Sequence, residues 1–272
     1  MNPPLIEVVS GSATDAGLRR RINEDSHIAS SPVFLVADGM GGHQAGEVAS
    51  AAVIAAFAEL VGGPSTSTMR DVRQALERAR HRVADLPLAA EGAGTTLTGV
   101  VLADVDGVGC WLTLNVGDSR TYLLSEGELE QISVDHSLVQ ELIDSGELDP
   151  VAAASDTRRN VITRAIGGGS NAEADYWVIP AQPGDRVLVC SDGLTGELGR
   201  GRIDAILQTE ADPQAAATRL VHEAMLHGGR DNITAIVVDA VAVHTRENIA
   251  PHDVDDVDED TRPRVGAGGD RS

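Results

Sequence analysis

Apolar runs with two different spacings alternate along the chain, and they predict helices and strands in separate groups. Residues 43–60 are rich in alanine, and a Gly-Gly-Pro break at 62–64 separates them from a second helix. That helix is predicted to begin at a Thr68 cap, with Asp71 three residues later as the reciprocal partner. The apolar positions that follow keep helical spacing: Val72, Ala75, Leu76, Ala79 and Val83.

Between residues 95 and 132 the pattern changes to apolar runs of strand length. Asp-Gly, Gly-Asp and Glu-Gly pairs separate these runs, as in antiparallel hairpins. The predicted strands cover 96–102, 111–116, 122–124 and 129–132. A short helix is predicted over about 136–144, ending at Gly146, and a polar, mobile surface segment over 149–160.

The last third of the chain returns to strands and then to a helix. Strands are predicted over 176–179 and 186–190, and a final strand over 233–243. Between them a helix begins at Asp212, an acidic cap followed by proline at the first helical position. Because strands are grouped with strands and helices with helices, the sequence predicts an α+β fold with antiparallel sheets.

Composition adds a strong negative charge to this picture. Acidic residues outnumber basic ones 42 to 21, which gives a formal net charge of -21. Such a field opposes binding to nucleic acid or anionic lipid and attracts cations. Part of the excess lies in 251–272, which has few apolar residues and is expected to be disordered. We therefore predict a folded domain over 1–245 and an acidic C-terminal tail over 246–272.

The two cysteines and the N-terminal segment indicate the compartment. Cys110 and Cys190 lie inside apolar runs, where a reduced thiol behaves as a small hydrophobic side chain. The first residues lack the basic start and apolar run of a signal peptide, and no apolar run reaches the ~20 residues of a membrane span. We expect a cytoplasmic protein with both thiols reduced and no membrane span.

Several apolar runs border an aspartate with glycine or asparagine beside it. Asp38, Asp118 and Asp192 each follow a predicted strand, and Asp231 precedes the last one. If these strands are neighbours, their carboxylates converge on one rim, where they repel one another unless a cation neutralises them. An all-oxygen set suits Mg²⁺ or Mn²⁺ better than Zn²⁺. Taken singly, an Asp-Gly pair is more often a turn than a ligand, so the pattern alone leaves both interpretations open.

Short motifs occur in a fixed order from about residue 8 to residue 240. They are GLRRRINEDS (17–26), VADGMGGH (36–43), GEVAS (46–50), GTT (94–96), NVGDSR (115–120), DHS (135–137), RNVITRAIG (159–167), SDGL (191–194) and DNIT (231–234). Together they resemble the type 2C metal-dependent serine/threonine protein phosphatases in their bacterial form. The resemblance implies two antiparallel sheets packed as a central sandwich and flanked by helices, in α-β-β-α layers.

The same resemblance implies a protein serine/threonine phosphatase that uses two Mn²⁺ or Mg²⁺ ions. Asp38 would bridge the ions, Gly39 would offer its carbonyl, and Asp192 and Asp231 would supply the remaining acids. Asp25 stands where the family places an acid that holds metal-bound water. A hydroxide bridging the two ions would attack the phosphorus of phosphoserine or phosphothreonine in line, without a phosphoenzyme.

Three further residues receive roles from the resemblance, each beside a simpler explanation. Arg20 would grip two phosphoryl oxygens as a fork, although three consecutive arginines also fit a solvated basic turn. Asp118 would join Asp192 at a third, weaker cation, and a hairpin turn explains it equally well. The leaving group would be protonated by water or by His43, which could equally cap the alanine-rich helix.

The chain departs from the family pattern in two places. Many bacterial relatives carry His-Pro before the Arg-Asn at 159–160, whereas here Arg158 is preceded by Ser-Asp-Thr, so the flap over 145–170 and its substrate preference are open. Met40 occupies the position of a histidine that is proposed as the general acid in animal relatives. A thioether cannot donate that proton.

The expected partners follow from the family. They are phosphorylated proteins and a cognate serine/threonine kinase, with no nucleic acid, and we expect a monomer. Two alternatives stay open: a specialised phosphatase of a partner-switching cascade, and a non-catalytic metal-binding module whose site has decayed. Because the matched acids and Arg20 are all present, catalysis is favoured over decay.

Deletion of the tail tests the predicted domain boundary. If 251–272 is a disordered appendage, its removal takes away no packed apolar surface, so the melting temperature and the turnover of a small aryl phosphate should be nearly unchanged. Thermal melts and steady-state rates of the truncated and full chains measure this. A fall of many degrees would mean that the tail packs on the body.

Overall fold

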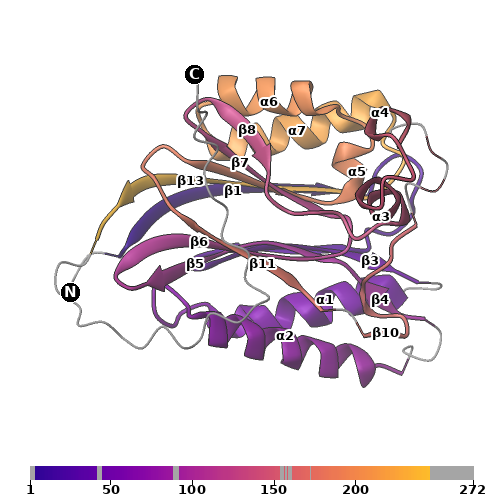
Figure 1. Ribbon diagram of the computed structural model, residues 1–272, viewed down its shortest axis with the longest axis horizontal. Helices are drawn as coiled ribbons and strands as arrows, with labels where there is room; N and C mark the ends of the chain where they lie inside the picture. Colours follow the sequence, from indigo (N-terminus) through magenta and orange to yellow (C-terminus); the bar gives the residue numbers. More distant parts are fainter. Residues whose placement is uncertain are drawn as a thin grey trace.

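Four layers, helix-sheet-sheet-helix, make up the fold of the chain in a computed structural model (Figure 1). The structure describes residues 4–41, 45–87, 92–153, 156, 158, 161–171 and 173–245. The predicted tail over 246–272 therefore lies outside the described residues. Within them, no helix is long and apolar enough to cross a bilayer.

Two antiparallel sheets form the inner layers. The first has five strands in the order β1 (Ile6–Asp15), β13 (Ile233–Val243), β12 (Arg186–Cys190), β7 (Arg120–Ser125) and β8 (Glu128–Gln131). The second has eight strands, with the order β10 (Ser170–Asn171), β9 (Ile166–Gly167), β4 (Gly94–Thr95), β3 (Val33–Met40), β5 (Leu97–Val105), β6 (Val108–Val116) and β11 (Asp175–Pro180), and with β2 (Asp25–Ser30) paired to β3.

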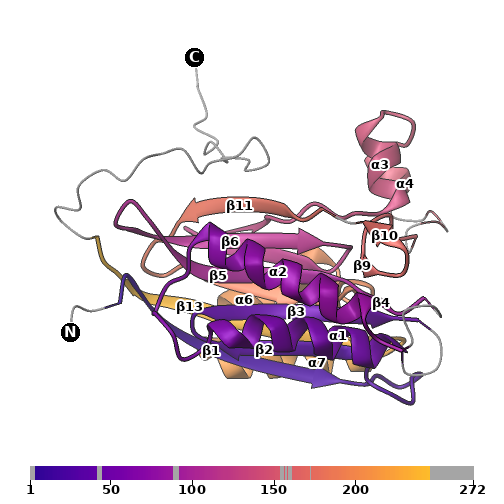
Figure 2. The same cartoon turned by 90° about the horizontal axis from the view of Figure 1, so that it is seen from below.

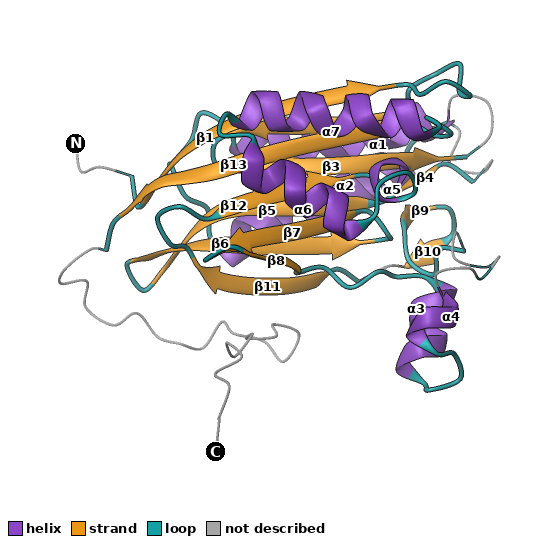
Figure 3. Cartoon of the chain, turned by 90° about the horizontal axis from the view of Figure 1, so that it is seen from above, coloured by secondary structure: helices purple, strands orange, loops and turns teal. Residues whose placement is uncertain are grey.

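Helices cover the outer face of each sheet. Figure 2 shows α1 (Ala45–Phe57) and α2 (Met69–Ala84) across the eight-stranded sheet, with the 3-10 turn η1 (Ala58–Leu60) between them in the sequence. Figure 3 shows α6 (Arg200–Thr209) and α7 (Pro213–His227) over the five-stranded sheet. Three short helices lie at one end of the sandwich: α3 (Leu138–Asp144), α4 (Pro150–Ala153) and α5 (Asp192–Thr195).

Strict alternation along buried strands produces three apolar layers. In β3, Val33, Leu35 and Ala37 face α1 and α2, whereas Phe34 and Val36 face the other sheet. A strand that is covered on both faces must be apolar at nearly every position, which is why 33–37 reads as a continuous hydrophobic run. The same alternation separates the two cysteines, because Cys110 packs under α1 and α2 while Cys190 packs under α6 and α7. Both are buried and free, as predicted.

Most predicted elements are present, and their caps explain their boundaries. Thr68 accepts from the amide of Asp71 at 3.2 Å, and the Asp71 carboxylate accepts from the amide of Thr68 at 2.9 Å, so the capping box is confirmed. Asp212 accepts from the amide of Ala215 at 2.8 Å and caps α7. The predicted strands over 186–190 and 233–243 are confirmed residue for residue. The elements β1, β2, α5, α6 and the two-residue strands β4, β9 and β10 were not predicted, and α4 forms within 149–160, where only a polar, mobile segment was expected.

The register of the strands brings their acidic ends together. Asp25 of β2 lies opposite Asp38 of β3 in the eight-stranded sheet. In the five-stranded sheet, Cys190 at the end of β12 lies opposite Arg120 at the start of β7 and Ala235 near the start of β13. The segments that carry the aspartates therefore emerge at one end of the sandwich, beside α5 (Figure 1).

Candidate metal centre and adjoining cleft

The predicted acids converge on this end from both sheets. Asp25 and Asp38 come from the eight-stranded sheet, and Asp118 lies in the turn between β6 and β7. Asp192 begins α5 shortly after β12, and Asp231 lies two residues before the start of β13. Five acidic side chains that are up to 206 residues apart in sequence, from Asp25 to Asp231, thus share one rim of the sandwich.

Asp25 ties the two sheets together at this rim. One carboxylate oxygen, Oδ2, accepts from Ser191 Oγ at 2.8 Å and from Thr234 Oγ1 at 2.7 Å; Thr234 belongs to β13 of the opposite sheet and Ser191 directly follows β12 of that sheet. The other oxygen, Oδ1, is buried and has no hydrogen-bond partner. A buried oxygen without a partner loses its hydration, so it is available to a ligand such as a cation.

Burial and mutual repulsion raise the pKa of four of these acids. Burial is the largest cause for Asp25, whose pKa rises to about 7, although the Thr234 and Ser191 hydroxyls oppose the rise and Asp192 and Asp231 add to it. The pKa of Asp118 also rises to about 7, first through burial and then through Asp192. Each charge thus makes its neighbours harder to ionise.

The pKa of Asp38 lies well above its usual range, because its burial is compounded by Asp25, Asp192, Asp118 and Asp231 in turn. Burial and then Asp231 raise the pKa of Asp192, and its interaction with Asp38 opposes the rise. Two interacting carboxylates need a proton or a cation to neutralise their repulsion. A divalent cation supplies that neutralisation without removing the negative charges.

The donor set fits a hard divalent cation. It consists of carboxylates, with buried and unpartnered oxygens on Asp25 and Asp118, and all-oxygen sets suit Mg²⁺ or Mn²⁺. Gly39 lies against the first turn of α1, where a Cβ would come within 2.2 Å of the Gly46 carbonyl oxygen. Among the described residues, no three ligating side chains already surround a common point. The assignment of Asp25, Asp38, Gly39, Asp118, Asp192 and Asp231 as ligands therefore stays a prediction.

Arg20 reaches the rim from the loop between β1 and β2. Its Nη2 donates to Asp231 Oδ2 at 2.8 Å, and its side chain is 50% exposed. Asn232 holds this loop, because its amide nitrogen donates to the Ala16 and Ile22 carbonyls and its amide oxygen accepts from the Glu24 N–H. A guanidinium is thus exposed beside the carboxylate cluster. The sequence also allowed a simple solvated turn here, whereas in the structure Arg20 is bonded to Asp231.

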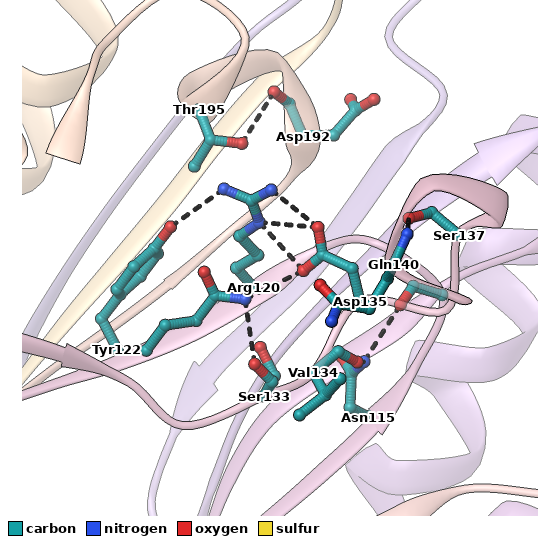
Figure 4. A network of polar contacts seen from close by, with 12 residues as sticks. Asn115, Arg120, Tyr122, Ser133, Val134, Asp135, Ser137, Gln140, Asp192 and Thr195 are labelled. Carbon is teal, nitrogen blue, oxygen red and sulfur yellow. Dashed lines mark hydrogen bonds and ion pairs between the residues drawn. The ribbon is translucent and has the colours of Figure 1, made fainter. Parts of the chain in front are cut away.

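A cleft of about 520 Å³ opens beside the acids. Asp118, Asp192 and Asp231 line one part of it, and Val139, Gln140, Ile143 and Ala153 from α3 and α4 line another. Arg120 lines the cleft as well, and Figure 4 shows its guanidinium between Asp135 and Tyr122. The Arg120 Nε and Nη2 atoms donate to both carboxylate oxygens of Asp135, with Nη2 at 2.6 Å from Oδ2. The residues of the predicted helix after 136 therefore face the acids across this cleft.

Several residues at the site were not singled out from the sequence. Thr96 holds Asp38 through two bonds, from the Asp38 amide to its Oγ1 at 3.0 Å and from its own amide to the Asp38 carbonyl at 2.9 Å. Glu24 lies beside Arg20 and the α1 amide of Gly46, and burial raises its pKa. The motifs GTT and NEDS contain these residues, but without the tertiary pairing nothing in them indicates a role. His43 lies outside the described residues.

Comparisons with known proteins agree with this fold and rim. Residues 20–226 match the Protein phosphatase 2C family. The chain is 39% identical over 265 residues to the serine/threonine protein phosphatase PstP of Mycobacterium tuberculosis, covering 94% of this chain and 50% of that protein. It is 34% identical over 239 residues to the serine/threonine phosphatase stp of Listeria monocytogenes, covering 83% of this chain and 93% of that protein.

A solved structure shares the architecture. The crystal structure of the catalytic domain of PstP in complex with 2 manganese ions superposes with a TM-score of 0.77 at 38% identity, covering 86% of this chain and 99% of that chain. Fold and site therefore define an α-β-β-α sandwich with an acidic rim at its strand ends. The chain belongs to the protein phosphatase 2C family, which confirms the resemblance and the predicted layers. It spans about half the length of the mycobacterial relatives that it matches.

Replacement of Asp38 by Asn tests whether the rim is a cation site. The change removes one of the repelling charges, so in EDTA the variant should melt no lower than the wild type. Saturating Mn²⁺ at about 100 times Kd would stabilise the wild type by about 2.7 kcal/mol. At ~2–4 °C per kcal/mol this is a rise of roughly 5–10 °C, and the variant should gain less.

The control is Asp204→Asn in α6, on the outer layer, which should respond to Mn²⁺ as the wild type does. Thermal melts with and without Mn²⁺ make the comparison. Equal Mn²⁺ shifts in wild type and Asp38→Asn would show that Asp38 is no ligand.

Proposed function

We propose that the chain is a metal-dependent protein serine/threonine phosphatase that hydrolyses phosphoserine and phosphothreonine on other proteins. The observation that carries this proposal is the convergence of five aspartates from both sheets on one rim, with an exposed arginine beside them. Relatives that are named serine/threonine phosphatases, and a similar structure with two manganese ions, support it. The domain boundary at residue 245 stays part of the proposal.

Each side chain at the rim has a proposed task. Asp38, Asp192 and Asp231, with the Gly39 carbonyl, would hold two Mn²⁺ or Mg²⁺ ions, Asp25 would hold water beside them, and Asp118 with Asp192 would serve a third, weaker ion. When bound, such cations neutralise the rim and lower the pKa of water, so that hydroxide is available at neutral pH. The chain's own part is to orient that water and the phosphoryl group in line. Both cysteines are buried, so neither serves as the nucleophile.

Arg20 provides the phosphate contact. A guanidinium presents parallel N–H donors that match two phosphoryl oxygens, and the exposed half of this side chain leaves donors beyond the one that Asp231 accepts. We place the protein chain of the substrate along the cleft of about 520 Å³ that Asp192 lines. Protonation of the leaving group by water or His43, a cognate kinase, a cytoplasmic location and a monomeric state stay predictions of the sequence.

Removal of divalent cations tests the function directly. Because the nucleophile depends on the cations, hydrolysis of an aryl phosphate and of a phosphothreonine peptide should vanish in excess EDTA and return on addition of Mn²⁺ or Mg²⁺. Phosphate release is the measurement. Full activity in excess chelator would contradict the proposed mechanism, and Mn²⁺ binding without any turnover would favour the decayed, non-catalytic module.

Substitution of Arg20 separates phosphate capture from cation binding. Arg20→Lys keeps a positive charge near Asp231 but loses the fork, so KM for a phosphopeptide should rise while Mn²⁺ affinity is retained. Arg20→Ala should cost more in kcat/KM, on the order of 2 kcal/mol for lost charge-assisted hydrogen bonds. Arg19→Ala, a neighbouring arginine in the same loop, is the matched control and should behave as the wild type. Wild-type KM and kcat in Arg20→Ala would reduce Arg20 to an anchor of its loop.

A further inference from the structure

The turn that carries Asp118 is gripped from one side by His136. The backbone N–H of Gly117 donates to His136 Nδ1 at 3.1 Å, and the backbone N–H of His136 donates to the Gly117 carbonyl at 2.9 Å. Both the N–H and the carbonyl of Gly117, the residue before Asp118, are therefore hydrogen-bonded to His136. The histidine is only 5% exposed and Asp118 only 7%, so water does not substitute for these bonds.

The partners of the imidazole determine its tautomer and its orientation. An amide N–H can only donate, so Nδ1 is the unprotonated acceptor and, in the neutral ring, the hydrogen lies on Nε2. Nε2 is 3.2 Å from Asp175 Oδ2, at the start of β11. The second carboxylate oxygen, Asp175 Oδ1, accepts from Arg164 Nη1 at 3.2 Å. Asp175 thus fixes the ring in the form that accepts from Gly117.

His136 also contacts residues 162–164, which lie inside the predicted flap over 145–170. Its carbonyl accepts from the Thr163 N–H at 2.8 Å, and Ser137 and Ile162 form an antiparallel bridge beside it. Arg164, one residue further, lies 3.4 Å from His136 Nε2 as well as on Asp175. The residues at 162–164 and the Asp118 turn are therefore joined through His136, the former through its backbone carbonyl and the contact of Arg164, the latter through its backbone and its ring.

The other side of the same turn packs on Thr96, which in turn holds Asp38. Gly117 has φ +107°, and a Cβ there would lie 2.6 Å from Thr96 Cγ2, so the turn packs directly on Thr96. Thr96 Oγ1 lies 2.8 Å from Ser119 Oγ and accepts from the Asp38 amide at 3.0 Å. With Thr96 on one side and His136 on the other, the Asp118 carboxylate has little freedom to change direction.

We propose that His136, oriented by Asp175, is a positioning residue that fixes the Asp118 carboxylate toward a divalent cation and links this acid to the base of the flap. The inference rests on the proposed function, because it assigns Asp118 to a cation. Partners that orient a metal ligand typically contribute 10-fold to 100-fold in affinity or activity. Mn²⁺ binding in the absence of substrate is therefore the main readout.

Titration of the metal-free full chain with Mn²⁺, followed by calorimetry and electron paramagnetic resonance, tests the proposal. His136→Leu keeps the approximate bulk but removes the acceptor, so the weakest-bound Mn²⁺ should lose about tenfold or more in affinity. His136→Asn restores an acceptor near the Nδ1 position and should recover most of the loss. Asp118→Ala sets the limit, because the ligand itself is absent. In turnover, His136→Leu should lower kcat and leave KM for an aryl phosphate unchanged.

Two further variants keep the test decisive if His136→Leu folds poorly. Asp175→Ala removes the group that orients the ring, together with its ion pair to Arg164, from an edge strand where the side chain is 26% exposed, and should weaken the same Mn²⁺ step. Asp185→Ala is the matched control, since it removes a buried carboxylate that accepts from Trp111 Nε1 at 3.0 Å and Ser125 Oγ at 2.7 Å at the opposite end of β12. It should lower the melting temperature without changing Mn²⁺ binding.

Wild-type Mn²⁺ affinities in both His136→Leu and Asp175→Ala would overturn the proposal, as would a His136→Asn variant no better than His136→Leu. An equal loss of Mn²⁺ affinity in Asp185→Ala would overturn it too, because the effect would then follow stability alone. Weakened Mn²⁺ binding in the His136 and Asp175 variants of a chain that shows no phosphatase activity would support the positioning role and reject the proposed function.

Discussion

Repulsion among the rim aspartates is the constraint on which the rest of this structure depends. Asp38 is the centre of that repulsion, since the charges of Asp25, Asp192, Asp118 and Asp231 all raise its pKa in addition to burial. Such a cluster is destabilising by itself and persists only if the surrounding scaffold is rigid. The three apolar layers supply this rigidity, because β3, β6, β12 and the first half of β13, which lead to the rim, are buried on both faces. Stability is thus concentrated in the body and strain at the end where the chemistry is proposed.

A seam of small hydroxyl side chains transmits that rigidity between the two sheets. Thr98 of β5 and Thr121 of β7 join one sheet to the other, with their Oγ1 atoms 3.0 Å apart. Thr96 and Ser119, which lie just before β5 and β7, have their hydroxyl oxygens 2.8 Å apart. Asp25 extends the seam through its bonds to the Ser191 and Thr234 hydroxyls. Apolar contacts alone allow two sheets to slide, whereas directional bonds at these positions fix their relative register. The separation of acids from different sheets is therefore set by hydrogen bonds next to them.

The sequence was informative wherever a local rule decided the structure. Alternation and turn residues determined the strands over 186–190 and 233–243, and the Thr68 and Asp212 caps set the starts of two helices. It failed for β1, where Ser10, Gly11 and Ser12 break the apolar pattern because this edge strand is partly exposed and packs closely on α7. Aspartates at strand ends were visible in the sequence. Their arrangement at one rim, however, depends on strand pairings such as Asp25 with Asp38, and the position of Arg20 depends on its contact with Asp231 across 211 residues. Such long-range contacts leave no local pattern. The family resemblance assigned Arg20 and these acids to one site, but it predicted neither of these two contacts.

The contact between Arg20 and Asp231 also links the two halves of the proposed chemistry. Asp231 Oδ2 accepts from Arg20 while Oδ1 accepts from the Asn232 N–H, so both oxygens of this acid are already engaged at the rim. A cation that binds Asp231 competes with the guanidinium for the same oxygen and weakens its hold on Arg20. The donors released in this way are those a phosphoryl group needs. Because coupling between two binding events is reciprocal, phosphate bound by Arg20 in turn favours the cation at Asp231. An acidic rim on a chain of net charge -21 can therefore still attract an anionic substrate once cations are present.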